Sequence, residues 1–288
     1  MAVHIGVPVR CGEMGISDLP LGKVGGQPIN LLEEPLQVEC HGPAVFICQI
    51  YAPGNTEASC FRYLYVFQCA ECKSAFVYRA QLPSSTSGLT EEPKADDWNE
   101  ETKDTDLLEM LSSSQTQKKS NFALEVYQES SEVTQVINRL YDLDLKNESE
   151  VQSLYEMMDL GVEQEVSSEE DEEGMDDLIK EMEKKARAER DVSFDVLKFS
   201  SDLEHNECIR YSRGGVPLWY SDSNRPNTQV PPCECGSERT FEFQVLPQVL
   251  GFVGNLDLEF GTLLIYTCQA DCSITNYTPE TILIQSSL

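Results

Sequence analysis

Two stretches near the C-terminal end, PPCECGSERTFEFQVLPQVL at 231–250 and GTLLIYTCQADCS at 261–273, carry the pattern that decides the fold. Each combines a close pair of cysteines with a run of aromatic and β-branched residues, and such runs favour β-strands. An antiparallel hairpin of the two runs would bring together four cysteines: Cys233, Cys235, Cys268 and Cys272. Zinc prefers four thiolate or imidazole ligands in a tetrahedron. The pattern predicts a structural zinc site; the alternative is four reduced thiols without metal, since free cysteine is commonly buried.

The N-terminal part of the chain repeats this order. Cys40 is followed nine residues later by Gln49 in FICQIYAP, and Cys235 is followed nine residues later by Gln244 in FEFQVLPQ. A second strand-like run and a cysteine pair then follow in both parts, as YLYVFQCAEC and as TLLIYTCQADC. Repeated order with one identical spacing indicates an internal duplication. The strands that this pattern predicts cover residues 44–51, 61–68, 240–246 and 261–267.

The first module offers a second metal site that is incomplete. Its cysteines in the repeated positions are Cys40, Cys69 and Cys72. The repeat places Val38 where the second module has Cys233, so one ligand is missing. Three residues remain as candidates for it: His41, Cys48 and Cys60. Cys48 aligns with Phe243 inside a strand, which favours a place in the core over a place in the metal site.

The chain is strongly acidic, with a formal net charge of −29 over 288 residues. That charge would repel nucleic-acid backbones and anionic membranes, whereas a basic protein would be attracted. No apolar run has the length of a signal-peptide core or a membrane helix. Cysteines in close pairs are typical of metal ligands in a reducing compartment. We therefore expect a soluble, intracellular protein that binds neither membrane nor nucleic acid directly. We also expect it to be a monomer.

Cysteine placement divides the chain into zones. No cysteine lies in 73–207, and the acidic part of this zone, 91–190, has 30 acidic and 11 basic residues. Such composition is typical of solvated chain with little packing. We expect an α+β, mainly β fold, in which two related zinc-binding antiparallel β modules pack together and are joined by the acidic linker. The expected regions are an N-terminal module at 1–83, a largely disordered linker with short helices at 84–195, and a C-terminal module at 196–288.

The linker contains several local patterns. Short helices are predicted at 151–158 and at 175–190. In 175–190 the acidic residues come early and the basic residues come late, an order that the helix dipole favours. One set of apolar residues has the spacing of a leucine-rich nuclear export signal, with an ordinary amphipathic turn as the alternative: Ile137, Leu140, Leu143 and Leu145. Ser167 and Ser168 precede acids three residues later and are candidate phosphorylation sites.

Nothing in the sequence indicates an active site. There is no G-x-S-x-G, P-loop, G-x-G-x-x-G or H-E-x-x-H motif. Gly25-Gly26 and Gly214-Gly215 are followed by prolines, which favours turns over phosphate-binding loops. We expect a protein that is not an enzyme, and four protein ligands would leave the zinc no open position for water.

Several segments resemble one known family. They are YSRGGVPLW, PPCECGSERTFEFQVLPQVL and YTCQADCS in the second module, and GKVGGQP, QIYAP, FQCAEC and FVYRAQLP in the first. Over about 22–83 and 196–288 the chain resembles the programmed cell death protein 2 family, in the branch that lacks the MYND finger of the founding member. The family's first module opens with a C-x-x-C pair, and here Gln37 stands in the place of its first cysteine.

The resemblance implies a role in ribosome assembly. Members of the family act as chaperones or adaptors for a basic small-subunit ribosomal protein, eukaryotic protein two, on its way to the 40S precursor. The resemblance also implies pre-40S particles and an export receptor as partners, with shuttling between nucleus and cytoplasm. The alternative is a zinc-dependent protein–protein scaffold in transcription or in cell-cycle and apoptosis regulation.

Overall fold

The runs of aromatic and β-branched residues form strands where they were predicted. In the computed structural model, which describes residues 3–10, 22–83, 122–158, 191–203 and 207–287, most regular structure is β. The strands are β1 His4–Arg10, β2 Gly22–Val24, β3 Ala44–Tyr51, β4 Phe61–Cys69, β5 Ala75–Leu82, β6 Phe122–Gln128, β7 Ile209–Tyr211, β8 Arg239–Val245, β9 Thr262–Cys268, β10 Thr278–Pro279 and β11 Thr281–Gln285. The helices are α2 Ser131–Asp142, α3 Glu148–Met157, α5 Val192–Leu203 and α6 Val249–Val253, with a 3-10 turn η1 at Glu57–Ser59. The expectation of a mainly β fold is confirmed.

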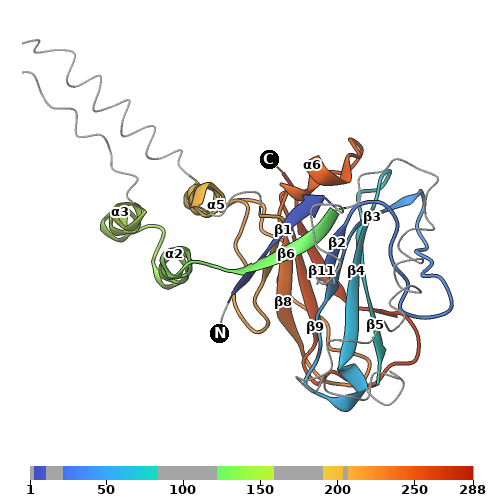
Figure 1. Cartoon of the computed structure of the whole chain (residues 1–288). Helices are drawn as coiled ribbons and strands as arrows, with labels where there is room; N and C mark the ends of the chain where they lie inside the picture. Colours follow the sequence, from blue (N-terminus) through green and yellow to red (C-terminus); the bar gives the residue numbers. More distant parts are fainter. Residues whose placement is uncertain (1–2, 11–21, 84–121, 159–190, 204–206, 288) are drawn as a thin grey trace, which may run out of the picture.

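The strands form one antiparallel sheet in the order β10-β5-β4-β3-β2-β6-β1-β7-β8-β9-β11. The two edge strands are neighbours in the chain, because only Glu280 separates β10 from β11. β10 pairs with β5 and β11 pairs with β9, so the sheet curls round until it is nearly closed (Figure 1). The expected arrangement of two packed β modules is therefore corrected: the two parts share one continuous sheet.

The sheet has an internal two-fold relation that follows the duplication. The strand order from β5 inward (β5, β4, β3, β2, β6) matches the order from β11 inward (β11, β9, β8, β7, β1). At its centre, β1 and β6 pair antiparallel around the contact Val7–Glu125. Both halves have a β-bulge at the same place, between Phe46 and Cys48 and between Phe241 and Phe243. These equivalent irregularities support the predicted duplication, since a bulge belongs to a particular strand pair.

Two strands that the sequence analysis did not predict, β1 and β6, complete this sheet. β1 pairs with β7 of the C-terminal half, and β6 pairs with β2 of the N-terminal half. β6 lies within 84–195, which we expected to be linker, and the helix predicted at 151–158 is part of α3. The helix predicted at 175–190 lies outside the described residues, as do Ser167 and Ser168. The boundaries 1–83, 84–195 and 196–288 stay a prediction about domains.

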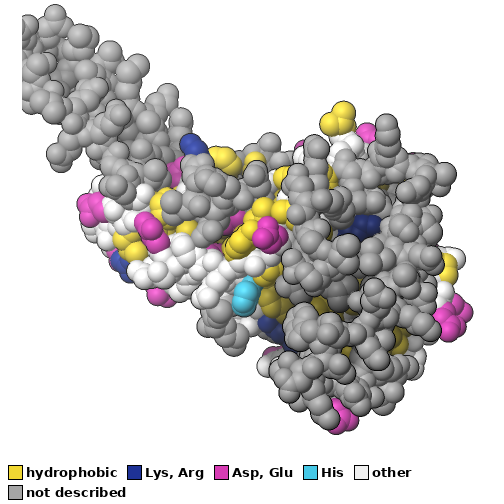
Figure 2. All heavy atoms as spheres, viewed as in Figure 1, with side chains coloured by type: hydrophobic (Ala, Val, Ile, Leu, Met, Phe, Trp, Pro, Cys, Tyr) yellow, Lys and Arg dark blue, Asp and Glu magenta, His cyan; other side chains and the backbone are white. Residues whose placement is uncertain are grey.

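The main hydrophobic core lies inside the curled sheet and takes side chains from both halves. Cys48 and Leu64 of the first half pack there with Phe243 and Ile265 of the second. A second cluster joins α2, α3 and α5 to the sheet through Leu218 and other residues. In the views of Figures 1 and 2 the helices lie beside β1 and β6, and apolar side chains are visible between the helices and the sheet. No described helix has the length and apolar character needed to span a membrane.

A buried ion pair connects the halves across the interior of the sheet. The guanidinium of Arg62 on β4 donates two hydrogen bonds to the carboxylate of Glu242 on β8, of 2.6 and 2.7 Å. Neither side chain is exposed to solvent. Burial acts to raise the pKa of Glu242, but the nearby charge and hydrogen bonds of Arg62 outweigh it, so the pKa is lowered. Breaking such a pair by removing one partner costs about 3–5 kcal/mol, because a charge is left buried.

Candidate metal centres

The turns at one end of β8 and β9 bring the four C-terminal cysteines together. Arg239, the first residue of β8, pairs with Cys268, the last residue of β9, so the chain before β8 meets the chain after β9. The four sulfur atoms of Cys233, Cys235, Cys268 and Cys272 all lie within 4.8 Å of one another. The Sγ atoms of Cys233 and Cys272 are 3.7 Å apart, and those of Cys235 and Cys268 are 3.6 Å apart. These four residues could hold one metal ion.

A tight turn holds the first of these cysteine pairs. The backbone N–H of Gly236 donates to the carbonyl of Cys233 at 2.8 Å, and Ser237 accepts from the N–H of Cys233 at 2.8 Å. Gly236 has a φ of 86°, in the left-handed region that glycine adopts without strain. A residue with a Cβ would be strained at this position of the turn.

The thiols of this cluster differ in acidity. Burial acts to raise the pKa of Cys268, but backbone N–H groups of Cys272 and Ala270 and the neighbouring thiols outweigh it and lower that pKa to about 7. Burial raises the pKa of Cys233 to about 12. A bound cation would favour the deprotonated form of all four thiols.

An arginine from the other half of the sheet supports the cluster. Arg79 on β5 donates to the Sγ of Cys272 at 3.2 Å and to its carbonyl oxygen at 2.9 Å. The same guanidinium pairs with buried Glu280 at 2.8 Å, and Glu280 also pairs with Arg239 at 2.7 Å. Partners of this kind orient the ligands of a metal site. The sequence analysis missed Arg79 and Glu280; an arginine inside the apolar strand AFVYRAQL was the available signal.

The N-terminal cysteines form a smaller cluster at the equivalent turns. Cys40, Cys69 and Cys72 have their sulfur atoms within 4.8 Å of one another, and those of Cys40 and Cys72 are 3.3 Å apart. Hydrogen bonds from the side chain and backbone of Ser74 lower the pKa of Cys72 to about 6. The hydrogen bond with Cys72 raises the pKa of Cys40. This cluster too could hold a metal ion.

None of the three candidate fourth ligands belongs to this cluster among the described residues. Cys48 is fully buried in the sheet interior, as its alignment with Phe243 indicated. Cys60 precedes β4 whereas Cys69 ends it, which separates them by about 30 Å at the rise of a strand. His41 follows Cys40 directly, but its ring nitrogens do not join the three sulfurs. Gln37 is exposed, and Val38 packs against apolar side chains.

The residues of the candidate export signal lie on and after α2. Ile137 is fully buried, and Leu140 and Leu143 are 6% and 8% exposed, whereas Leu145 is 40% exposed. The first three pack in the helical cluster with α3 and α5. The expectation that this segment lies in an exposed arm is therefore wrong for three of its four apolar residues.

The two Gly-Gly pairs form turns, as predicted. Gly25, Gly26 and Gly214 have φ values near 70°. The chain after each turn makes an equivalent hydrogen bond to a glutamine side chain. The side-chain oxygen of Gln49 accepts from the N–H of Ile29 at 2.6 Å, and the side-chain oxygen of Gln244 accepts from the N–H of Leu218 at 2.7 Å. The two glutamines that revealed the repeat thus perform the same structural task in both halves.

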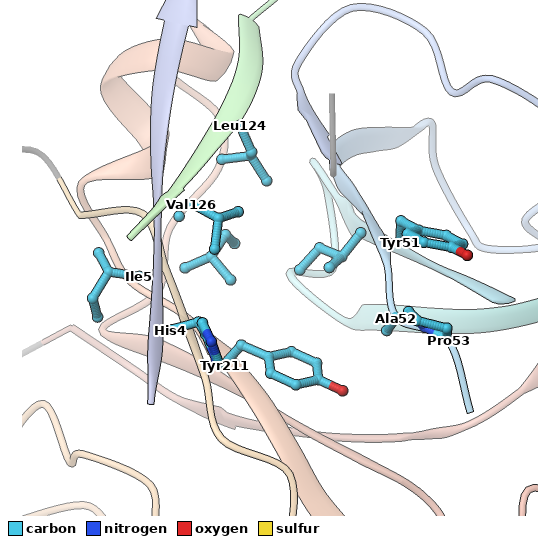
Figure 3. A pocket seen from close by; sticks show the side chains of 11 residues that line it. His4, Ile5, Tyr51, Ala52, Pro53, Leu124, Val126 and Tyr211 are labelled. Carbon is cyan, nitrogen blue, oxygen red and sulfur yellow. The ribbon is translucent and has the colours of Figure 1, made fainter. Parts of the chain in front are cut away.

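A cavity of about 350 Å³ opens between β1, β6 and β7 on one side and the end of β3 on the other (Figure 3). Its lining is mainly apolar, and His4, Tyr51 and Tyr211 are its polar members. The described lining residues include no serine, cysteine or carboxylate that could form a nucleophile–base pair with His4.

Comparison with known proteins gives matches over both halves. The family model described as programmed cell death protein 2, C-terminal putative domain, matches residues 191–286, and the model of the N-terminal domain matches residues 14–96. Programmed cell death protein 2 of Bos taurus is 28% identical over 309 residues, covering 90% of this chain and 88% of the relative. The names of these relatives mention no enzymatic activity.

Two further relatives match over shorter lengths. Programmed cell death protein 2-like of Mus musculus is 41% identical over 71 residues, which cover 23% of this chain and 20% of that protein. A protein of Schizosaccharomyces pombe named probable 20S rRNA accumulation protein 4 is 35% identical over 89 residues, covering 26% and 22%. No solved structure is similar enough to count as a match.

Proposed function

Because the chain belongs to the programmed cell death protein 2 family, we propose that it is a non-enzymatic, zinc-dependent adaptor that chaperones a basic small-subunit ribosomal protein during 40S assembly. The observation that carries this proposal is the similarity to the fission yeast protein named for 20S rRNA accumulation. Its client would be the ribosomal protein eukaryotic protein two, and its further partners would be pre-40S particles and an export receptor.

The charge of the chain supports a basic client. A formal net charge of −29 creates a field that attracts a cationic protein and suppresses direct binding to RNA. A ribosomal protein is strongly basic before it meets rRNA, so an acidic partner would shield it from wrong contacts. Attraction of this kind weakens as salt rises, which makes it measurable.

The geometry of the C-terminal cluster supports zinc as its metal. Zinc–sulfur bonds of about 2.3 Å in a tetrahedron place the sulfurs about 3.8 Å apart. The sulfur–sulfur distances are 3.7 Å between Cys233 and Cys272 and 3.6 Å between Cys235 and Cys268, and all four donors are cysteine sulfurs. Such a zinc would be structural, because four protein ligands leave no position for a reacting water.

Shuttling between nucleus and cytoplasm is part of the proposal. The apolar residues at 137–145 remain the candidate export signal, but three of the four are buried. A receptor could bind them only after α2 separates from α3 and α5.

Affinity purification of the tagged full chain tests the client. We expect a basic 40S protein to co-purify, and its yield to fall as ionic strength rises. Deleting 91–190 would also remove β6, so the sharper variant changes only the acidic run 169–173, EEDEE, to QQNQQ. This variant should lower the yield at low salt and reduce its salt dependence; the absence of any ribosomal protein from the wild-type sample would contradict the proposal.

A second candidate function is a zinc-dependent scaffold in transcription or in cell-cycle and apoptosis control. The names of the mammalian relatives favour it, since they refer to programmed cell death. This function is favoured if the same purification recovers partners whose binding depends on zinc and recovers no 40S protein.

A further inference from the structure

The two cysteine clusters occupy equivalent places in the two halves of the sheet, but they are not equally complete. Cys40 precedes β3 by four residues, as Cys235 precedes β8, and Cys69 and Cys268 each end the following strand. In this equivalence Val38 takes the position in the N-terminal half that Cys233 has in the C-terminal half. Among the described residues, the C-terminal cluster therefore has four sulfur donors, and the N-terminal cluster has three.

No other described side chain supplies the missing donor. Within the described residues, no further histidine, cysteine, aspartate or glutamate side chain groups with the three sulfurs. Val38 has only methyl groups to offer, and it packs against the aromatic cluster around Phe46 and Tyr65. The site is accessible from solvent, because Cys72 is exposed and Cys40 is partly exposed.

We propose that the N-terminal cluster is an open three-thiolate zinc site that takes its fourth ligand from outside the chain. Zinc held by three protein ligands keeps a fourth position for water or an incoming ligand, unlike the closed four-ligand sites that are purely structural. Since the three sulfurs make this zinc soft, the incoming ligand it favours is a thiolate or an imidazole. In the free chain water fills the position, and a cysteine or histidine of a bound protein replaces it.

The open site should bind metal more weakly than the closed one. Loss of an outer partner of a metal ligand alone costs about 10–100-fold in metal affinity, and here a ligand itself is absent. We therefore expect zinc at the N-terminal site to be at least about tenfold easier to remove by a competing chelator than zinc at the C-terminal site.

Cobalt substitution of the full chain tests the proposal, with imidazole as the probe of the open position. The wild-type chain should bind two cobalt ions, and added imidazole should change the visible absorption of one of them. Cys72→Ser should remove that ion and the imidazole response together, and leave the absorption of the other ion unchanged.

Val38→Cys is the informative variant, because it restores the donor that the second half has. It should abolish the imidazole response and bring the chelator resistance of the N-terminal site up to that of the C-terminal site. Val38→Ala is the matched control; it removes the same methyl groups without adding a donor, and should keep the response.

Two results would overturn the proposal. One is a wild-type chain that binds a single cobalt ion at saturation, since the three cysteines would then hold no metal. The other is a second cobalt ion whose absorption ignores imidazole, since a donor of the chain would then close the site. Both results are measured on the wild-type chain, so the test remains valid even if a variant fails to fold. Neither depends on the ribosomal client, so this inference can fail while the proposed function stands, and the reverse.

Discussion

At the scale of single residues, buried charges fix how the two halves meet. Arg62 reaches Glu242 across the interior, and Arg79 on β5 reaches Glu280 and the four-cysteine cluster of the C-terminal half. Each guanidinium is wholly buried, so each must be paired to be tolerated there. The halves can therefore associate in few ways, because any other arrangement would leave these charges without partners.

The contact of Arg79 with Cys272 gives a prediction about the metal. Arg79→Met should lower the affinity of the C-terminal site by about 10–100-fold, because the thiolate loses a cationic hydrogen-bond donor. Competition with a chromophoric chelator measures this. Arg239→Met is a matched control, since Arg239 pairs with the same Glu280 but donates its other hydrogen bonds to backbone carbonyls and, among the described residues, to no sulfur. Equal losses in the two variants would show that the contact with sulfur is unimportant.

At the scale of elements, α2 shows how one pattern can indicate two things. Val133, Val136, Ile137 and Leu140 recur at helical spacing, and all four are buried. The side chain of Ser130 caps the helix by accepting from the N–H of Val133 at 3.2 Å. Two of these residues, Ile137 and Leu140, also belong to the spacing of the candidate export signal, because such signals are themselves amphipathic. Burial favours the structural role for the folded state.

Two variants separate the structural role of α2 from export. Ile137→Ala removes a fully buried side chain and should cost about 2–5 kcal/mol of unfolding free energy. Leu145→Ala changes a half-exposed residue and should alter it by less than about 0.5 kcal/mol. Urea unfolding measures both. If export of the protein is also followed in cells, loss of export in Leu145→Ala at unchanged stability would show that the motif works as a signal.

At the scale of the whole molecule, the shared sheet makes the two halves one cooperative unit. β1 of the N-terminus completes the C-terminal half, and β6 completes the N-terminal half. The interior core contains side chains of both, so neither half can keep its apolar surface buried alone. The duplication therefore produced one nearly closed sheet in place of two independent modules.

This unity predicts a single unfolding transition. Leu64→Ala in the N-terminal half should lower the stability by about 2–5 kcal/mol, because Leu64 is fully buried in the shared core. In a Trp98→Phe background, Trp219 reports on the C-terminal half by fluorescence, while far-ultraviolet circular dichroism reports on the whole sheet. Both midpoints should shift together. A fluorescence midpoint that does not move would mean that the halves unfold independently.

Much of the candidate site was readable from sequence, because its information is local. The cysteine pairs stand beside strands whose aromatic and β-branched composition marks them, and β3 spans 44–51 as predicted. The antiparallel register of β8 and β9 pairs Arg239 with Cys268 and so brings the four sulfurs to one end of the hairpin. The glutamines and Gly-Gly turns were visible too, although their shared hydrogen-bonding task was not.

The sequence by itself determined the four strands beside the cysteines, the duplicated order and the candidate ligands at each turn, since these depend on neighbours along the chain. Only the tertiary structure decided that β1 and β6 join the halves into one sheet, and that Arg62 meets Glu242 at a separation of 180 residues. It also decided that Ile137 is buried and that Cys48 and Cys60 lie away from the N-terminal cluster. The physical reason is that β pairing and burial depend on which distant segments share one core, and local composition carries no record of that choice.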